Sequence, residues 1–153
     1  MLPSGRRLAI DYGDVRIGLA ISDTTALVAS PLRTIQNRVD NVVALNQEIT
    51  SRVLDDAISV VYIGLPIHLS GGEGTSTEKV RHFAQELRSY IGSSHIEMRL
   101  VDERLSTKSA ISQAKSIGKK LTRDDVDQMA AVAILEFALQ WESSSGRLAG
   151  DEI

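Results

Sequence analysis

The apolar positions of the chain recur with two different periods, which predict strands near its beginning and helices further along. Residues 7–12 and 15–23 have the composition of two strands, and Gly13-Asp14 between them is a two-residue hairpin signal that begins with glycine. A third strand is predicted over 27–36. We therefore expect the chain to open with strands that run antiparallel to one another.

After these strands the pattern changes to an alternation of helices and short, continuously apolar strands. Apolar residues at helical spacing predict four helices, over 41–57, 77–91, 107–117 and 124–141. Residues 59–66 and 96–101 are apolar runs typical of buried strands in a parallel sheet. This order predicts one α/β domain in which an antiparallel hairpin unit joins parallel strands through right-handed crossovers. We expect that single domain to span residues 1–142, because the polar run over 143–153 predicts a flexible tail.

The composition limits the kinds of chemistry that the chain can carry. It has 153 residues, of which 42% are apolar and 24% charged, as is usual for one soluble globular domain. There is no cysteine, which excludes disulfides and cysteine-bound zinc, and the three histidines are scattered. Oxygen ligands would therefore have to hold any metal, which favours Mg²⁺ or Mn²⁺. No apolar run reaches the roughly 18–20 residues of a membrane span, and no signal peptide is visible, so we expect a cytoplasmic protein.

Charge is unevenly distributed along the chain. The net charge of −3 is unusual for a nucleic-acid-binding protein, but the segment 105–123 contains no acid. The positive residues of this segment are Lys108, Lys115, Lys119, Lys120 and Arg123. On charge alone, a solvated helix face and loop would explain the segment equally well. Its position between two candidate metal ligands, Glu103 and Asp127, favours contact with a phosphate backbone.

Three acidic residues lie where the predicted elements would bring them together. Asp11 ends the first strand, and Glu103 follows the strand over 96–101, at the edge where binding sites form in open α/β sheets. Asp127 falls on the flank of the apolar stripe of the last helix, at about 100° per residue, and should face the sheet. Acids that converge from separate elements favour a site for one or two divalent ions, which would assist the attack of water on a phosphodiester.

Two of these acids also have a purely structural interpretation. Asp11 could stabilise the tight turn that follows it by hydrogen bonding to its own backbone. Asp102 or Glu103 could cap the next helix. Because side chains alternate along a strand, only one of these two adjacent acids can readily join the site.

The interpretation of Asp127 depends on its partner. A structural salt bridge to Arg16 or Arg104 would remove the cost of burying its charge and would leave no role for a metal. Asp124 and its neighbour Asp125 fall outside the apolar stripe and fit the first turn of the helix, where acids favour the helix dipole. Arg16 itself could hold a substrate phosphate or could neutralise the acids in the metal-free state.

The motifs LAIDYGDVRIGLAISD, VVYIGLPIHLSGGEG, VDERLST and VDQMAAVAIL, in this order, resemble the YqgF family of bacterial proteins, also called RuvX. Its members are described as nucleases of pre-16S rRNA and, formerly, as Holliday junction resolvases. The resemblance covers residues 6–141 and implies a ribonuclease H-like α/β fold, with a five-stranded mixed sheet, its first three strands antiparallel, and helices on both faces. It implies an acidic site of Asp11, Glu103 and Asp127. Other motif positions are matched by Gly13, Arg16, Gly18, Arg104 and Thr107.

This resemblance implies a metal-dependent endonuclease that acts on structured RNA, in the maturation of the 5′ end of pre-16S rRNA. The three acids would hold Mg²⁺ or Mn²⁺, and Arg16, Arg104 and the basic residues of 105–123 would bind the nucleic acid. The alternatives are a Holliday junction resolvase acting on branched DNA and a non-catalytic nucleic-acid or ribosome-assembly module. An actin-like phosphate site would need two copies of the domain, and the chain has no repeat. We expect a monomer or a weak homodimer without membrane association.

Overall fold

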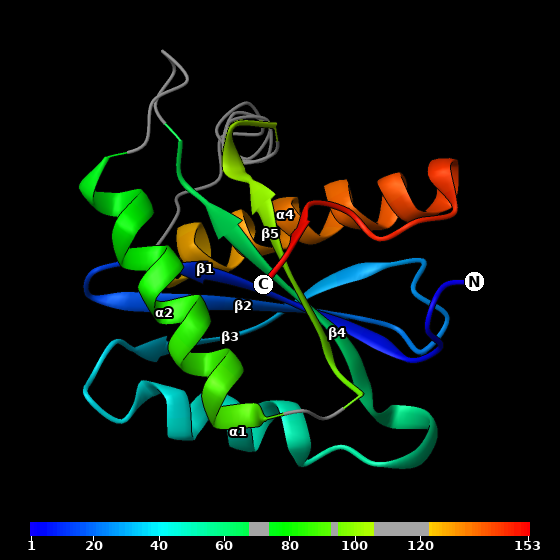
Figure 1. Ribbon diagram of the computed structural model, residues 1–153, viewed down its shortest axis with the longest axis horizontal. Coiled ribbons are helices and arrows are strands. Elements are labelled where there is room, and N and C mark those ends of the chain that lie inside the picture. The colour runs from blue at the N-terminus through cyan, green and yellow to red at the C-terminus, as the bar shows by residue number, and fades with distance from the viewer. Residues whose placement is uncertain (68–73, 93–94, 106–122) are drawn as a thin grey trace.

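The computed structural model describes the chain except for residues 68–73, 93–94 and 106–122 (Figure 1). Its strands are β1 Arg6–Tyr12, β2 Arg16–Ser22, β3 Ala29–Gln36, β4 Ile58–Leu65, β5 Glu97–Asp102 and β6 Asp151–Glu152. Its helices are α1 Asn41–Thr50, α2 Thr75–Ile91 and α4 Arg123–Ser145, with the 3₁₀ turns η1 Leu54–Asp56 and η2 Glu103–Leu105. The helix predicted over 107–117 lies outside the described residues. The other elements confirm the predicted order of strands and helices.

All six strands in the described part of the chain belong to one sheet, in the order β3-β2-β1-β4-β5-β6. β1, β2 and β3 form an antiparallel meander, β4 and β5 run parallel to β1, and β6 is antiparallel to β5. The predicted mixed sheet with three antiparallel strands first is confirmed, but it has six strands rather than five. The parallel strands place the carboxyl ends of β1, β4 and β5 at one edge of the sheet.

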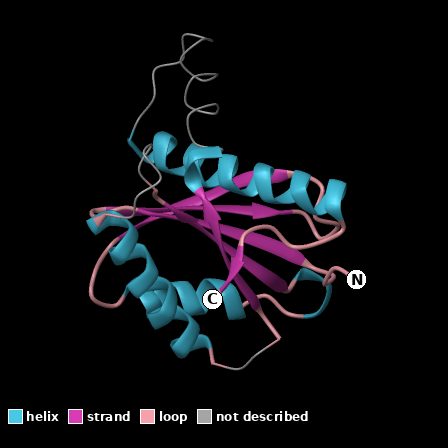
Figure 2. Cartoon of the chain, turned by 45° about the horizontal axis from the view of Figure 1, so that its top comes forward, coloured by secondary structure: helices cyan, strands magenta, loops and turns pink. Residues whose placement is uncertain are grey.

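Helices cover both faces of this sheet, as predicted (Figures 1 and 2). α4 packs across β1, β2 and β3 on one face, while α1 and α2 pack together on the other. Side chains along β1 alternate between the faces: Leu8 and Ile10 enter the core beneath α1 and α2, whereas Ala9 enters the core beneath α4. Arg7 and Asp11 therefore share the α4 face with Ala9, towards opposite ends of the strand.

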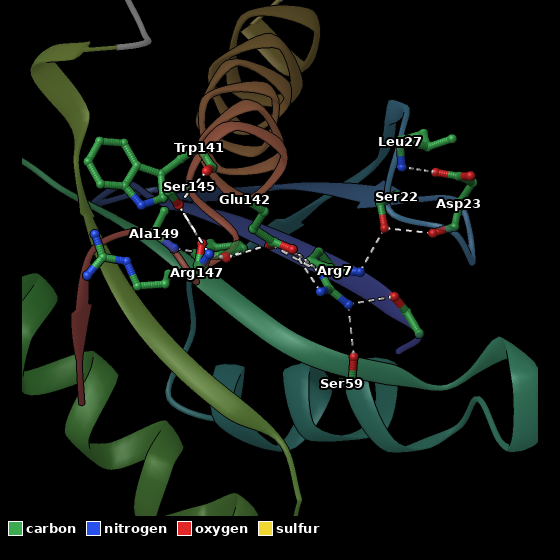
Figure 3. A network of polar contacts seen from close by, with 12 residues as sticks. Arg7, Ser22, Asp23, Leu27, Ser59, Trp141, Glu142, Ser145, Arg147 and Ala149 are labelled. Carbon is green, nitrogen blue, oxygen red and sulfur yellow. Dashed lines mark hydrogen bonds and ion pairs between the residues drawn. The ribbon is translucent and has the colours of Figure 1, made fainter. Parts of the chain in front are cut away.

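A buried polar cluster lies at the Arg7 end of this face (Figure 3). The side chains of Arg7 and of Glu142, near the end of α4, are 2% and 4% exposed, and Arg7 Nη2 donates to Glu142 Oε1 at 2.7 Å. Tyr62 on β4 donates its hydroxyl to Glu142 Oε2 at 2.6 Å and accepts the backbone N–H of Ala149 at 3.3 Å. Arg7 also donates to Ser59 Oγ. The cluster joins β1, β4, α4 and the chain that follows α4.

The chain beyond residue 143 differs from the flexible tail that its polar composition predicts. α4 continues to Ser145, Ala149 is fully buried, and β6 pairs with β5. Gly150 has a φ of +68° and brings the backbone so close to β5 that a Cβ on it would lie 2.0 Å from the carbonyl oxygen of Leu100. The order of this segment comes from contacts with distant residues, which the local composition does not reveal.

The helix predicted over 41–57 is shorter than expected. α1 ends at Thr50, because Val53 is extended and Leu54 has a φ of +58°, a conformation that an α-helix cannot contain. A single 3₁₀ turn then leads into β4. None of the helices in the described ranges is both long and apolar enough to span a membrane.

Candidate active site

Asp11 lies near the carboxyl end of β1, on the face that α4 covers, just before a tight hairpin. The hairpin closes through a hydrogen bond from the Gly13 N–H to the Arg16 carbonyl at 3.0 Å. A Cβ on Gly13 would lie 2.6 Å from the same carbonyl oxygen, so the turn requires glycine. The turn brings β2 back beside Asp11, with Gly18 as its direct partner across the two strands.

Gly18 places Asp127 next to Asp11. α4 crosses β2 so closely that a Cβ on Gly18 would lie 2.2 Å from the backbone carbonyl oxygen of Asp127 and 3.1 Å from its Cβ. Because Gly18 is the neighbour of Asp11 in the sheet, the two acids reach the same place from different elements. Asp127 thus faces the sheet, as its position on the apolar stripe predicted, and the missing side chain at Gly18 allows the helix to approach.

Glu103 reaches the same edge from the opposite side. It is the first residue after β5, and its Oε2 lies 3.8 Å from the position that a Cβ on Gly64 would take. Gly64 follows Ile63, whose partner on β1 is Ile10, so it lies beside Asp11. Glu103 and Asp11 are therefore brought together by the parallel pairing of β1, β4 and β5.

Asp102 does not join this group. Its Oδ1 accepts the backbone N–H of Arg104 at 3.0 Å, and Arg104 Nη2 lies 2.6 Å from its Oδ2. The side-chain hydrogen bond from Arg104 is the main reason that the pKa of Asp102 lies below its usual value. Asp102 therefore caps the turn η2, while Glu103 lies beside Asp11; the helix that one of these acids was expected to cap, over 107–117, lies outside the described residues.

The three acids lie close enough together to affect the pKa of Asp11. Burial raises the pKa of Asp11 most, followed by the negative charges of Glu103 and Asp127 and by a hydrogen bond with Glu103. Together these causes raise the pKa of Asp11 to about 7, from an ordinary value of 3.8. A proton or a bound cation would relieve the repulsion among the acids near neutral pH.

A salt bridge to Arg16 partly neutralises Asp127. Arg16 Nε donates to Asp127 Oδ2 at 2.9 Å, and the two side chains are 22% and 23% exposed. This is one of the two ion pairs that the sequence left open for Asp127, and the other candidate, Arg104, binds Asp102. Within the described residues, no three Asp, Glu, His or Cys side chains have the arrangement of a metal-holding group. The acids are close to one another but are not preassembled around a cation.

Most of the predicted nucleic-acid-binding residues lie outside the part of the chain that the structure describes. These are Lys108, Lys115, Lys119 and Lys120. Only the backbone of Arg123 is described, as the first residue of α4. Arg16 and Arg104 are described, and both bind acidic side chains at the carboxyl edge of the sheet.

Two features of the site were not predicted from the sequence. Gln128 donates to Thr34 Oγ1 at 3.3 Å, which ties the beginning of α4 to the edge strand β3. A Cβ on Gly64 would lie 2.5 Å from Cδ1 of Ile134, so this glycine also makes room for α4. A glycine inside an otherwise apolar strand was the only sequence signal for such a close approach.

Comparisons with known proteins identify the family to which the chain belongs. Residues 5–141 match the model of the RuvX family, described as Holliday junction resolvase. A protein of Streptomyces coelicolor, named "Putative pre-16S rRNA nuclease", is 41% identical over 151 residues, which cover 97% of this chain and 88% of that protein. A protein of the same name from Leifsonia xyli is 41% identical over 152 residues, which cover 98% of this chain and 95% of that protein.

Solved structures share the fold. T. thermophilus RuvC in complex with a Holliday junction substrate has a TM-score of 0.62 at 12% sequence identity, over 97% of this chain and 99% of that chain. A second T. thermophilus RuvC structure has a TM-score of 0.55, also at 12% identity. At this identity the likeness concerns the fold alone, and it confirms the ribonuclease H-like α/β fold.

Proposed function

Because the chain belongs to the RuvX family, we propose that it is a nuclease that hydrolyses phosphodiester bonds with the help of divalent metal ions. The observation that carries this proposal is the convergence of Asp11, Glu103 and Asp127, where burial and mutual repulsion raise the pKa of Asp11 to about 7. Such a group of acids destabilises a fold unless a cation compensates it. A carboxylate with a strongly raised pKa, beside two other acids at the carboxyl edge of an α/β sheet, therefore supports a functional site.

The donor atoms of this group are of the kind that a hard divalent cation prefers. Asp11, Glu103 and Asp127 offer only oxygen atoms, which suits Mg²⁺ or Mn²⁺. One or two such ions bound there would supply an activated water and would stabilise the negative charge that develops on the phosphate. Asp11 would have the central place, because its neighbours in the sheet lead to Asp127 on one side and to Glu103 on the other.

The remaining parts of the site would position the substrate. Asp11 lies on a strand with neighbours on both sides, which suits a group whose place must be fixed. We propose that Arg16, Arg104 and the basic residues of 105–123 bind phosphates on either side of the bond to be cut. Such contacts hold the backbone of a nucleic acid without reading its sequence.

We propose pre-16S rRNA as the substrate, in the maturation of its 5′ end, because relatives that are 41% identical carry that name. Cleavage of branched DNA is a second candidate, supported by the description of the family model and by the fold shared with RuvC. The acids would serve both substrates by the same chemistry. A resolvase must cut two symmetric strands and would therefore need a dimer, whereas cleavage of the RNA requires only a monomer.

Cleavage assays with two substrates and two variants test this proposal. A labelled 5′ leader fragment of pre-16S rRNA and a four-way DNA junction are each incubated with Mg²⁺, Mn²⁺ or EDTA. Asp11→Asn removes a carboxylate of the site. The control Asp14→Asn makes the same chemical change on an exposed residue of the same hairpin, whose partner is Lys79 at 3.1 Å.

We expect cleavage of the RNA that requires metal, falls roughly 100-fold or more in Asp11→Asn and stays within about twofold in Asp14→Asn. Cleavage of the junction alone would change the substrate to branched DNA. No cleavage of either substrate, with RNA bound equally by wild type and Asp11→Asn, would contradict the nuclease function. That result would favour a non-catalytic module in ribosome assembly.

A further inference from the structure

The guanidinium of Arg16 binds Asp127, one of the three acids proposed to hold a metal ion. Arg16 begins β2 and shares the α4 face with Gly18, the residue over which Asp127 lies. The 2.9 Å contact joins Arg16 Nε to Asp127 Oδ2, so the arginine engages a carboxylate oxygen of the site. A guanidinium only donates hydrogen bonds, and it carries a positive charge that would repel a cation at the same carboxylate.

The other two acids are arranged differently. Glu103 raises the pKa of Asp11 through its charge and a hydrogen bond, and Asp127 raises it through its charge. Among the side chains that the structure describes, no three candidate ligands are arranged to hold a metal ion. The carboxylate of Asp127 that would share an ion with Asp11 and Glu103 is already engaged by Arg16.

The exposure of this ion pair favours such an exchange. The side chains of Arg16 and Asp127 are 22% and 23% exposed, whereas those of the Arg7–Glu142 pair are 2% and 4% exposed. Separating a buried pair leaves two uncompensated charges in the core. Separating a pair that water already reaches costs far less, because water and the incoming cation compensate the two charges.

We propose that Arg16 is a displaceable counter-ion, which neutralises Asp127 in the metal-free protein and leaves it when a divalent ion binds to the three acids. This inference rests on the proposed function. The released guanidinium remains beside the site, where it can bind a phosphate oxygen of the substrate. The two roles that the sequence left open for Arg16, neutralising the acids and binding phosphate, become successive states of one residue.

The exchange makes Arg16 a competitor of the metal ion, so removing Arg16 should strengthen metal binding. Isothermal titration calorimetry with Mn²⁺ and no substrate measures this without reference to catalysis. We expect Arg16→Met to bind Mn²⁺ roughly three- to tenfold more tightly than wild type, because the ion no longer has to break the ion pair. The control Lys79→Met removes a positive charge that is paired with Asp14 on the hairpin after Asp11, and it should change the affinity by less than about twofold.

A double-mutant cycle separates direct competition from a general effect of charge. If Arg16 competes through Asp127, Arg16→Met should raise the affinity for Mn²⁺ by less than about twofold in the Asp127→Asn background. An equal gain in both backgrounds, or no gain in the wild-type background, overturns the inference. The absence of Mn²⁺ binding by both wild type and Arg16→Met at millimolar concentrations would contradict the proposed function itself, and the inference with it.

A measurement on the wild-type protein avoids dependence on the folding of the variants. The Nε–H signal of Arg16 in a ¹⁵N NMR spectrum, assigned by its loss in Arg16→Lys, reports the hydrogen bond to Asp127. We expect this signal to shift as Mg²⁺ is added, and to reach its final position as calorimetry shows the site to be saturated. A signal that does not move while Mg²⁺ binds overturns the inference.

Discussion

Asp11 shows at the scale of a single residue how the site affects the stability of the protein. Burial and two negative neighbours raise its pKa to about 7, above the ordinary value of 3.8. Between these two pH values the folded protein keeps a proton that the unfolded chain releases. The free energy of unfolding of the metal-free protein should therefore fall as the pH rises from about 4 to about 7, and should stay reduced at higher pH.

Asp11→Asn should consequently stabilise the metal-free protein at alkaline pH. At pH 8 in EDTA, we expect its free energy of unfolding to exceed that of wild type by on the order of 2–4 kcal/mol, because the amide keeps the shape of the carboxyl but carries no charge. Near pH 4 the difference should largely vanish, since Asp11 is then protonated in the folded wild type. Urea unfolding at both pH values measures the effect, and a difference independent of pH would contradict its cause.

α4 is the element that assembles the site, because it carries Asp127 over a sheet surface made of small residues. Ala9, Ala20 and Gly18 lie beneath it and allow its backbone to approach β1 and β2. The apolar stripe predicted both this helix and the inward direction of Asp127, because the stripe is a local property of the sequence. The closeness of the contact could not be predicted, since it depends on which turn of the helix meets which strand.

Gly18→Ala should disturb the placement of α4. The added Cβ would lie 2.2 Å from the backbone carbonyl oxygen of Asp127, which can move only if the helix moves. We expect the free energy of unfolding to fall by about 1–3 kcal/mol, as in overpacked cores. We also expect Mn²⁺ binding to weaken roughly tenfold or more, because Asp127 is displaced.

The matched control for this change is Gly64→Ala. Its Cβ would meet the Cδ1 of Ile134 at 2.5 Å, and the end of a flexible side chain can rotate away. Urea unfolding should therefore show a smaller loss of stability in Gly64→Ala than in Gly18→Ala, and calorimetry should show a smaller loss of Mn²⁺ affinity. Equal losses in the two variants would show that general crowding beneath α4, rather than the position of its backbone, controls the site.

Across the whole molecule, α4 connects two polar groups of opposite character. Asp127 lies in a group of acids whose charges raise the pKa of Asp11, whereas Glu142 lies in a cluster where Arg7 and Tyr62 satisfy its oxygens. None of the buried side-chain nitrogen and oxygen atoms in the described residues lacks a hydrogen-bond partner. A helix rises about 1.5 Å per residue, so the two acids are about 22 Å apart along its axis. The end of α4 that carries Asp127 is therefore suited to binding a cation, whereas the end that carries Glu142 stabilises the fold.

The cluster around Glu142 could not be predicted from the sequence, although the strands and the helix that carry it could. Periodicity assigns each residue to a face of its own element but does not pair it with a distant partner. The partners of Glu142 are 80 and 135 residues away in the chain, at Tyr62 and Arg7. The contacts of the segment after α4 could not be predicted for the same reason, because its partners are Tyr62 and β5. Local pattern thus predicted most of the elements and the convergence of Asp11, Glu103 and Asp127, while contacts over long sequence distances decided the rest.

Glu142→Ala should destabilise the whole fold. It leaves the buried guanidinium of Arg7 without its carboxylate, and the loss of one partner of a buried pair costs about 3–5 kcal/mol. Tyr62→Phe removes one hydroxyl from the same cluster and should cost about 1–2 kcal/mol, because it leaves the ion pair intact. Urea unfolding should therefore rank the two variants in this order, and the reverse order would show that the hydroxyl, not the ion pair, holds the cluster together.

Glu142→Ala also tests whether the two ends of α4 act independently. Because the cluster lies about 22 Å from Asp127 along the helix, Glu142→Ala that remains folded should bind Mn²⁺ as tightly as wild type. Calorimetry at a temperature well below the unfolding transition makes this comparison, with circular dichroism to confirm that the sample is folded. A weaker affinity in the folded variant would mean that the Arg7–Glu142 pair holds α4 at the position that Asp127 needs. The buried cluster would then contribute to the geometry of the site as well as to the stability of the protein.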